Sequence, residues 1–161
     1  MSELNFRTRV LPSDCDAVRR IVASSGFFNA GEVDVAVELA EENLARGDDS
    51  GYHFVFAESD GAVVGYGCVG PIACTESSFD FFWIAVHEAF RGRRVGRALL
   101  QACEARMREL GATRIYVETS GRAQYLPTRH FYVACGYEEV ASFPDFYAPG
   151  DAKIVYLKVL G

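Results

Sequence analysis

The chain has 161 residues, half of them hydrophobic, and a formal net charge of −6. This length suits one domain over residues 1–161, and twelve Phe and eight Tyr supply apolar surface for a core that needs neither disulfides nor a structural metal. The composition argues against a disordered chain, and the negative charge argues against a general nucleic-acid surface.

Cysteine usage and the N-terminus indicate where the protein works. The cysteines are odd in number and none has C-x-x-C spacing, so we expect reduced thiols and no metal. They are Cys15, Cys68, Cys74, Cys103 and Cys135. The first residues lack the charged and apolar regions of a signal peptide, and no run approaches the ~20 apolar residues of a membrane span. We therefore expect a cytoplasmic protein without a membrane partner.

The N-terminal segment predicts one strand followed by two helices. Residues 4–10 alternate between polar and apolar and are expected as a strand, which Pro12 ends. Ser13 is expected to cap a helix through about residue 23, because acidic residues follow it and suit the positive end of the helix dipole. Residues 26–29 are expected as a loop, and the apolar spacing over 32–46 predicts a second helix.

A hairpin and a central strand are expected next. Residues 52–58 and 62–69 flank Asp60-Gly61, and such a pair favours a two-residue turn between antiparallel strands. Residues 79–86 form a nearly continuous apolar run, which is typical of a strand covered on both faces.

The following segment predicts helix, strand and helix. Residues 95–110 have helical spacing of apolar positions and end at Gly111, a residue suited to a helix C-cap. The expected buried stripe consists of Val95, Leu99, Ala102, Cys103, Met107 and Leu110. Residues 114–118 are expected as a strand, and Pro127 suits the first turn of a helix that ends at Gly136.

The C-terminal part predicts two last strands, over 137–143 and 152–159, separated by a loop over 144–150. The chain has no repeat, linker or low-complexity stretch. The order of elements therefore predicts one mixed α/β domain.

The turn between the strand at 79–86 and the helix from 95 is the central signal. The start of a helix exposes about four unpaired N–H groups and the positive end of its dipole, and these can hold phosphates. Gly92 and Gly96 allow close approach of a ligand, and the turn carries arginines at 91, 93, 94 and 97. From the spacing alone, an anion site and a solvated basic turn stay equally open.

A second glycine-rich run has the letters of a dinucleotide fingerprint, in Gly65-Tyr66-Gly67-Cys68-Val69-Gly70. That motif must follow a strand and open a helix. Here the glycines lie inside a strand pattern, and no helical periodicity follows. We interpret them as strand residues that permit bulging or close packing, which argues against a nucleotide-dependent oxidoreductase.

The third signal gives a resemblance to a known family. Arg91-x-x-Arg94-x-Gly96 and Phe131-Tyr132-x-x-x-Gly136-Tyr137 occur in the order and on the elements in which the GNAT superfamily of N-acetyltransferases carries its two motifs. The chain resembles this family most strongly over 79–143. The resemblance implies an α/β (α+β) fold with a mixed sheet of about seven strands and about four helices, splayed between the fourth and fifth strands.

Two positions depart from the family pattern. The family usually has Gly where this chain has Arg94, so the loop is expected to bind somewhat differently. Many relatives also have an Asn within 119–127 that contacts the cofactor, and here Gln124 or Tyr125 takes that place.

The resemblance also implies the acetyl-CoA site. The strand before the loop pairs its backbone with the pantetheine arm, which maps to Ile84, Ala85 and Val86. The pyrophosphate is expected on the backbone of Arg91, Gly92, Arg93, Arg94, Val95, Gly96 and Arg97. Tyr132 matches the tyrosine that protonates the departing thiolate. A phenol with a pKa of ~10 suits a thiol with a pKa of ~8.5.

The base that deprotonates the amine has two candidates. Asp80 lies four residues before Ile84, where some relatives place a catalytic Glu, and Glu118 lies on the next strand. Both also have an ordinary interpretation as strand-end carboxylates facing water. His53 and His87 are less attractive, because lone histidines are more often structural.

Aromatic and acidic residues are candidates for the acceptor pocket, and together they favour a small cationic amine. They are Phe27, Phe28, Trp83, Asp145, Phe146, Tyr147 and Asp151. The leading hypothesis is therefore an acetyl-CoA-dependent N-acetyltransferase that uses direct attack and no metal. The alternative is a CoA-binding module or sensor without catalysis. A homodimer is common in such families.

Overall fold

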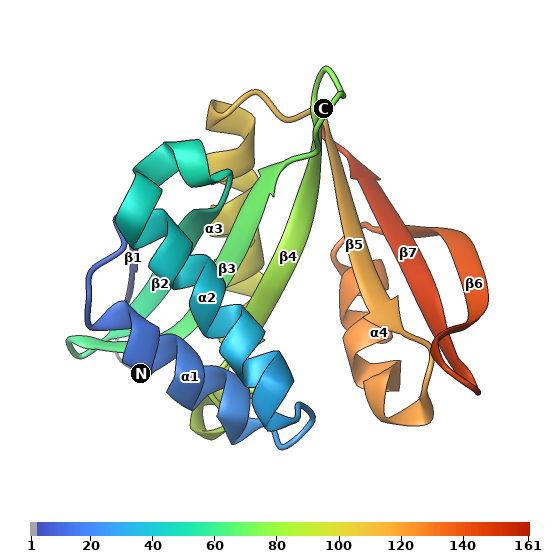
Figure 1. The fold of residues 1–161 in the computed structure, drawn as a ribbon, viewed down its shortest axis with the longest axis horizontal. Helices are drawn as coiled ribbons and strands as arrows, with labels where there is room; N and C mark the ends of the chain where they lie inside the picture. The colour runs from blue at the N-terminus through green and yellow to red at the C-terminus, as the bar shows by residue number, and fades with distance from the viewer. Residues whose placement is uncertain (1–2) are drawn as a thin grey trace. The chain divides into compact units, whose positions relative to one another are not determined.

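The computed structural model describes residues 3–161, which form seven strands and four α-helices (Figure 1). The strands are β1 (Leu4–Arg7), β2 (His53–Ser59), β3 (Ala62–Pro71), β4 (Ser78–Val86), β5 (Arg114–Ser120), β6 (Glu138–Ala148) and β7 (Asp151–Val159). The α-helices are α1 (Asp14–Ser24), α2 (Ala30–Arg46), α3 (Val95–Glu109) and α4 (Leu126–Ala134). No helix in this part of the chain is long and apolar enough to cross a membrane.

The strands form one mixed sheet in the order β1-β2-β3-β4-β5-β7-β6. Strand β2 pairs antiparallel with both β1 and β3. Strand β4 pairs in parallel with β5, through Ser78–Phe81 and Arg114–Val117. Strand β7 then lies antiparallel between β5 and β6. The expected mixed sheet of seven strands with four helices is confirmed, and its parallel pair lies where the sequence predicts the splay.

Two compact units divide the chain, and β4 contributes to both. The first unit holds the described residues up to Gly70 together with Trp83–Leu110, and the second holds Pro71–Phe82 together with Gly111–Gly161. The expectation of a single domain over 1–161 stays a prediction.

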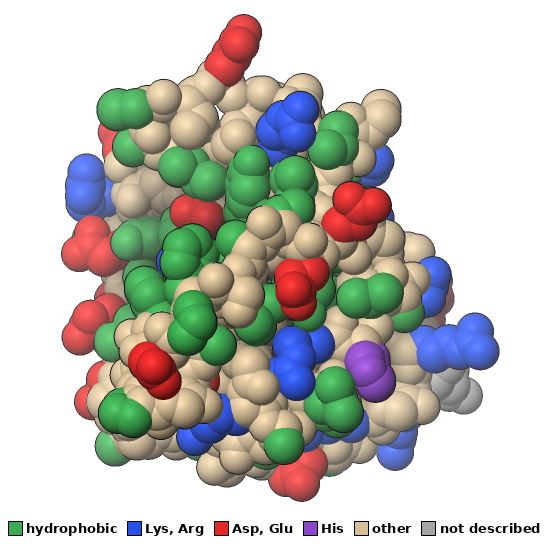
Figure 2. Space-filling model, turned by 90° about the vertical axis from the view of Figure 1, so that its right-hand side faces the viewer, with side chains coloured by type: hydrophobic (Ala, Val, Ile, Leu, Met, Phe, Trp, Pro, Cys, Tyr) green, Lys and Arg blue, Asp and Glu red, His purple; other side chains and the backbone are tan. Residues whose placement is uncertain are grey.

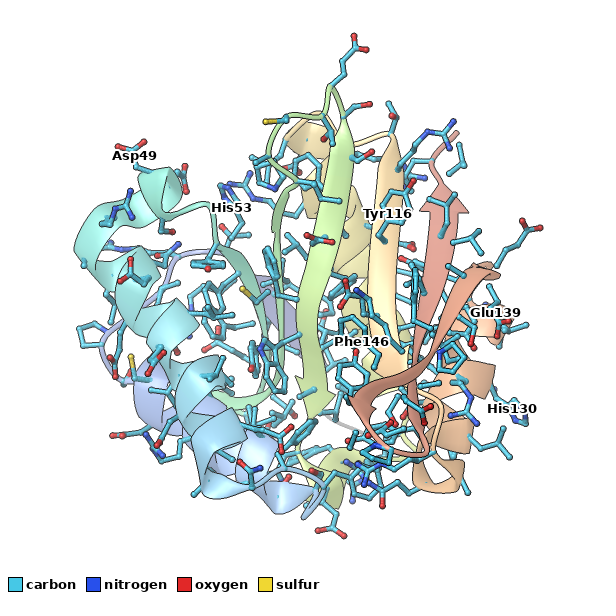
Figure 3. All side chains as sticks on the ribbon, turned by 45° about the vertical axis from the view of Figure 1, so that its right-hand side comes forward. Asp49, His53, Tyr116, His130, Glu139 and Phe146 are labelled. Atoms are coloured by element: carbon cyan, nitrogen blue, oxygen red, sulfur yellow. The ribbon has the colours of Figure 1, made fainter. Side chains whose placement is uncertain are left out.

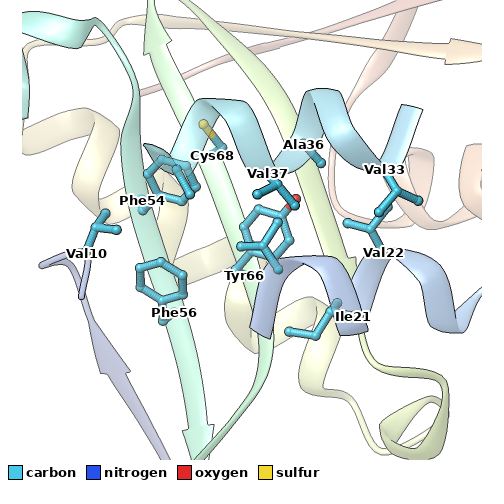
Figure 4. Packing of buried hydrophobic residues seen from close by; sticks show 12 residues of the cluster. Val10, Ile21, Val22, Val33, Ala36, Val37, Phe54, Phe56, Tyr66 and Cys68 are labelled. Carbon is cyan, nitrogen blue, oxygen red and sulfur yellow. The ribbon is translucent and has the colours of Figure 1, made fainter. Parts of the chain in front are cut away.

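The first unit buries its core between the sheet and helices α1 and α2 (Figures 1 and 4). Phe54, Phe56 and Tyr66 stack on one another across β2 and β3, with ring centroids 5.6–6.3 Å apart. Apolar residues of the two helices, such as Ile21 and Val37, cover these rings. Such burial of large aromatic and branched side chains is the main stabilising term for a domain of this size.

Close packing explains the glycine at position 65. A Cβ atom there would lie 3.0 Å from the carbonyl oxygen of Ala85 and 3.3 Å from side-chain atoms of Val86 and Leu99. The register of β2 and β3 also shifts between Ala57 and Glu58, opposite this residue. The structure therefore confirms that the run from Gly65 lies in a strand and opens no helix.

The helix starts differ in part from the sequence prediction. Ser13 is the N-cap residue of α1 as predicted, but its side chain makes no cap hydrogen bond, so that expectation is wrong. The buried carboxylate of Asp14 instead accepts hydrogen bonds from the Leu11 N–H at 2.6 Å and from Arg7. Helix α2 begins at Ala30 because Asn29 forms a capping box with Glu32, a start two residues earlier than predicted.

The C-terminal hairpin also differs from the prediction. The segment 144–150, expected as a loop, mostly belongs to β6, which runs to Ala148 and pairs there with Asp151. The register of β6 and β7 is irregular between Phe143 and Ala148, so the alternation that marks a strand in the sequence is interrupted there. Asp145 has a positive φ of 56°, and its side chain accepts a hydrogen bond from the Gly150 N–H at 2.7 Å, so the turn is closed locally.

Strands β4 and β6 are more exposed than their apolar content suggests. Phe82 of β4 is 38% exposed, so the expectation that this strand is covered on both faces is wrong for its second half. Strand β6 lies at the end of the strand order and exposes nearly every residue. Figure 2 shows hydrophobic side chains gathered on one face of the molecule.

Candidate active site

The turn before α3 has the backbone shape that an anion-binding loop requires. The chain leaves a short 3-10 helix at Glu88–Phe90, passes through Gly92 with a φ of 76°, and enters α3 at Val95. Arg94 occupies the N-cap position in the left-handed region, with φ 60° and ψ 15°. Two positive φ angles within three residues turn the chain sharply onto the helix axis.

The backbone N–H groups of residues 92–97 are available to a ligand. The Arg91 N–H donates to the Glu88 carbonyl at 3.2 Å, and the Ala98 N–H donates to the Arg94 carbonyl at 3.2 Å. Within residues 3–161, the amides between these two have no recorded partner. They lie at the positive end of the dipole of a 15-residue helix, which favours negative charge.

The arginines of this turn add positive charge at the same place. Arg91, Arg93, Arg94 and Arg97 are all exposed, and none of them forms an ion pair with an acidic side chain in the described part of the chain. The Arg93 guanidinium lies 5.3 Å from the centroid of the Phe90 ring. These charges are therefore free to meet an anionic ligand.

Along the second half of β4, the backbone N–H and C=O groups of successive residues point alternately toward β3 and away from it. The Ala85 carbonyl oxygen lies against Gly65 of β3, and the His87 N–H donates to the Val64 carbonyl at 2.8 Å. Because successive residues of a strand direct their backbone groups to opposite sides, those of Ile84 and Val86 point away from β3. Of the three predicted pantetheine contacts, these two have the suitable direction.

Tyr132 lies on α4 in an aromatic environment. Its ring centroid is 5.7 Å from that of Phe131, 5.8 Å from that of Tyr137 and 5.9 Å from that of Tyr156. The side chain is buried, and burial, followed by the nearby Cys135, raises the pKa of the phenol well above its ordinary value. The hydroxyl therefore keeps its proton at neutral pH, although it is a weaker acid than the sequence argument assumed.

The two candidate bases differ in their surroundings. Burial raises the pKa of Asp80, the negative charge of Glu118 raises it further, and the positive charge of Lys153 opposes both effects. Glu118 is half-exposed, and its Oε1 atom lies 3.1 Å from the Lys153 ammonium. An elevated pKa in a carboxylate near a second acid is typical of functional sites.

The aromatic candidates for the acceptor pocket include two separate pairs of rings in contact. The Phe28 and Trp83 rings make an edge-to-face contact in the first unit, with centroids 5.1 Å apart. In the second unit Phe146 and Tyr147 make a similar contact at 5.2 Å, and both side chains are exposed. Phe27 is 36% exposed.

The two acidic candidates for that pocket already have protein partners. Asp145 accepts the Gly150 N–H in the hairpin turn. The buried Asp151 accepts a hydrogen bond from the Ser120 hydroxyl and lies 3.3 Å from Arg122 Nε. Arg129 also donates to the Ser120 carbonyl at 2.8 Å, so this network fixes the chain between β5 and α4.

Sequence reasoning missed this network and Lys153. No motif contains the residues of this network, which are Ser120, Arg122 and Arg129. Their contacts form only when β5, β7 and α4 are in place. Lys153 carries one usable signal, because the sequence has only two lysines and both lie in its last predicted strand.

Comparison with known proteins identifies the family. The family model described as "Acetyltransferase (GNAT) family" matches residues 16–137, more than half of the chain. The chain belongs to the GNAT acetyltransferase family.

Solved structures are similar to this chain over almost its whole length. A GNAT-family protein from Desulfovibrio desulfuricans is 43% identical, with a TM-score of 0.96 over 99% of this chain and all of that one. An aminoglycoside 6′-N-acetyltransferase solved with coenzyme A has a TM-score of 0.75 at 16% identity, covering 98% of this chain and 96% of its own. The Salmonella typhimurium protein yncA, solved with acetyl-CoA, has a TM-score of 0.75 at 18% identity, covering 98% and 94%. The last two show the fold alone, and curated proteins give no match.

The backbone conformation of Arg94 explains why the family usually has Gly at this position. The residue is left-handed, a conformation that costs a non-glycine residue about 1–2 kcal/mol. The expected Asn replacements, Gln124 and Tyr125, lie in a short 3-10 helix at Ala123–Tyr125, where the Arg122 guanidinium is 5.6 Å from the centroid of the Tyr125 ring.

Proposed function

We propose that this GNAT protein transfers an acetyl group from acetyl-CoA to the primary amine of a small molecule by direct nucleophilic attack. The observation that carries the proposal is the start of α3, where the open amides of 92–97 and four exposed arginines suit a diphosphate. Coenzyme A and acetyl-CoA accompany two of the similar structures, which supports the same ligand here.

Residues of the first unit would hold acetyl-CoA. The amides at the start of α3 would bind the pyrophosphate, with the guanidinium groups of the turn adding charge. Ile84 and Val86 would pair with the pantetheine arm as an added strand, since their backbone groups point away from β3. Bound this way, acetyl-CoA supplies the thioester, a reactive acyl donor.

Residues of the second unit would move the protons. Asp80 or Glu118 would take a proton from the incoming ammonium, so that a neutral amine attacks the thioester carbonyl carbon. As the C–N bond forms and the C–S bond breaks, Tyr132 would give its phenolic proton to the departing sulfur. The nitrogen would then lose its second proton, which restores the proton of the Tyr132 phenol through solvent and leaves the neutral amide. The raised pKa of Tyr132 keeps the phenol protonated at neutral pH, so that the proton is present for donation.

The acceptor is proposed to be a small cationic amine, and the candidate aromatic contacts are Phe28 and Trp83 in the first unit and, separately, Tyr147 in the second. Aromatic faces and carboxylates attract an ammonium group, and both kinds of group lie among the candidate residues. A homodimer and a cytoplasmic location remain part of this proposal.

Thermal shift and an amine panel test the proposal. Acetyl-CoA, NADH and ATP are added separately, and acetyl-CoA alone is expected to raise the melting temperature, because selective binding stabilises the folded state. Thiol release is then followed with acetyl-CoA and a panel of amino acids, polyamines and aminoglycosides. Stabilisation by NADH or ATP instead, or no thiol release with any amine, contradicts the enzyme hypothesis.

The alternative is a CoA-binding module without catalysis, and Tyr132→Phe separates the two. In an enzyme this variant is expected to lose about 100-fold in kcat with little change in the Kd of CoA, because only the proton donor is removed. If residual thiol release in the wild type and the variant is equal, the binding module is favoured.

A further inference from the structure

One face of the second unit gathers two acids, one lysine and three aromatic rings. In the sheet register Asp80 is opposite Tyr116, Ser120 is opposite Lys153, and Lys153 is opposite Phe143. Side chains of directly paired residues, and of every second residue along a strand, share one face. Glu118 therefore lies on the same face as Asp80 and Lys153. Figure 3 shows Tyr116 and Phe146 on the same side of the sheet.

The Lys153 ammonium is enclosed by an acid and two rings. It lies 3.1 Å from Glu118 Oε1, 4.5 Å from the centroid of the Phe146 ring and 5.6 Å from that of the Phe143 ring. Only 18% of the Lys153 side chain is exposed, against 49% for Glu118. A lysine covered in this way has lost most of its freedom, so its charge acts at one fixed place.

The two acids on this face, Glu118 and Asp80, therefore differ in whether they have an ion-pair partner. The Oε1 atom of Glu118 is already the partner of an ammonium group, whereas no ion pair of Asp80 is recorded among residues 3–161. The charged groups that act on Asp80 are Glu118 from β5 and Lys153 from β7. Burial, followed by Glu118, Asp151 and Tyr125, raises the pKa of Tyr147 from β6, so that phenol adds no charge near pH 7.

We propose that Lys153 is a positioning residue that holds Glu118 as its counter-ion, which leaves Asp80 as the base that takes the proton of the acceptor amine. This inference rests on the proposed acetyl transfer and decides between the two bases that the sequence left open. A base works best when its pKa lies near the working pH, and the raised pKa of Asp80 agrees with that requirement.

The pH dependence of kcat/KM tests the assignment. The acidic limb reports the base of the free enzyme, which must lose its proton to act. Lys153→Met removes the charge that lowers the pKa of Asp80 and is expected to move this limb up by about half a pH unit or more. Glu118→Gln removes a charge that raises the same pKa and is expected to move the limb down. Asp80→Asn is expected to abolish the limb and to lower kcat about 100-fold.

Two control variants separate these effects from folding and net charge. Lys153→Arg keeps the positive charge and is expected to restore the wild-type limb. Arg114→Gln removes one positive charge from an exposed position at the start of β5 and is expected to leave the profile unchanged. A limb that stays in place in Lys153→Met overturns the proposal. The proposal is also overturned if Glu118→Gln loses the acidic limb and lowers kcat while Asp80→Asn keeps both the limb and the wild-type kcat.

A measurement without turnover distinguishes failure of this inference from failure of the proposed function. The carboxyl carbon of Asp80 is titrated by 13C NMR in the wild type and in Lys153→Met, in the absence of any substrate. A higher pKa of Asp80 in the variant supports the role of Lys153, and identical titration curves refute it. If the wild type acetylates no amine, the proposed function fails while this titration still decides the effect of Lys153.

Discussion

The close approach of β3 to β4 at Gly65 predicts that a single added methyl group is destabilising there. In Gly65→Ala the new Cβ atom would lie 3.0 Å from the Ala85 carbonyl oxygen and 3.3 Å from both Val86 and Leu99. The nearest of these atoms is backbone, so the strand itself must move. Overpacking of this kind costs about 1–3 kcal/mol, which lowers the melting temperature of a protein of this size by about 2–12 °C.

The same substitution is expected to weaken coenzyme A binding. A displaced Ala85 carries Ile84 and Val86 with it, and these residues are proposed to pair with the pantetheine arm. Loosening one or two hydrogen bonds, each worth about 0.5–1.5 kcal/mol, raises the Kd about three- to tenfold. The melting temperature is measured by circular dichroism and the Kd by isothermal titration calorimetry.

Gly31→Ala is the matched control, since it adds the same methyl group in α2. There the Cβ atom would meet only the side-chain Oδ1 of Asn29 at 3.3 Å, and alanine is the better helix former. We expect a free energy of unfolding within about 0.5 kcal/mol of the wild type. If Gly65→Ala is equally harmless, the close approach of β3 and β4 does not explain the glycine.

Two further predictions concern residues with positive φ angles. Arg94→Gly and Arg94→Ala both remove one charge from the α3 turn, so each is expected to raise the Kd of coenzyme A about two- to fivefold. Only glycine relieves the left-handed backbone. The melting temperature of Arg94→Gly is therefore expected to exceed that of Arg94→Ala by about 2–4 °C. Equal melting temperatures would contradict this account. Asp145→Ala loses the hydrogen bond from the Gly150 N–H and is expected to lower the melting temperature by about 2–4 °C, whereas Asp145→Asn keeps an acceptor oxygen and stays near the wild type. If Asp145 also attracts a cationic acceptor, both variants raise the KM for it alike; an unchanged KM in Asp145→Asn removes this residue from the acceptor pocket.

Local patterns were enough to predict most of the fold. The hairpin around Asp60-Gly61, the strand ending at Val86 and the helix beginning at Val95 lie within a residue or two of their predicted bounds. Each of these has a signal within a few residues, such as a tight turn, a continuous apolar run or a helical stripe. The extension of β6 to Ala148 lacks such a signal, because its pairing with Asp151 depends on a register irregularity.

The candidate site was predictable where backbone conformation carries the chemistry. The glycines and arginines of the α3 turn make an anion site one of two predictions from the sequence, and the open amides that the structure gives this turn agree with that prediction. Side chains that depend on tertiary contacts were not predictable in the same way. The partners of Asp151 and Glu118 lie about 30 residues away along the chain and meet them only through the pairing of β5 with β7.

The distribution of the proposed roles over the chain predicts that cofactor affinity and catalysis respond to different changes. The turn before α3 and the free edge of β4 belong to the first unit, while Tyr132, Asp80 and Lys153 belong to the second. Tyr132→Phe, Asp80→Asn and Lys153→Met are therefore expected to lower kcat or move its pH profile with a Kd of coenzyme A within about twofold of the wild type. Gly65→Ala and Arg94→Gly are expected to raise that Kd. A tenfold loss of coenzyme A affinity in Asp80→Asn, with an unchanged melting temperature, would show that the second unit binds the cofactor, and the backbone of the first unit would then be insufficient to explain recognition.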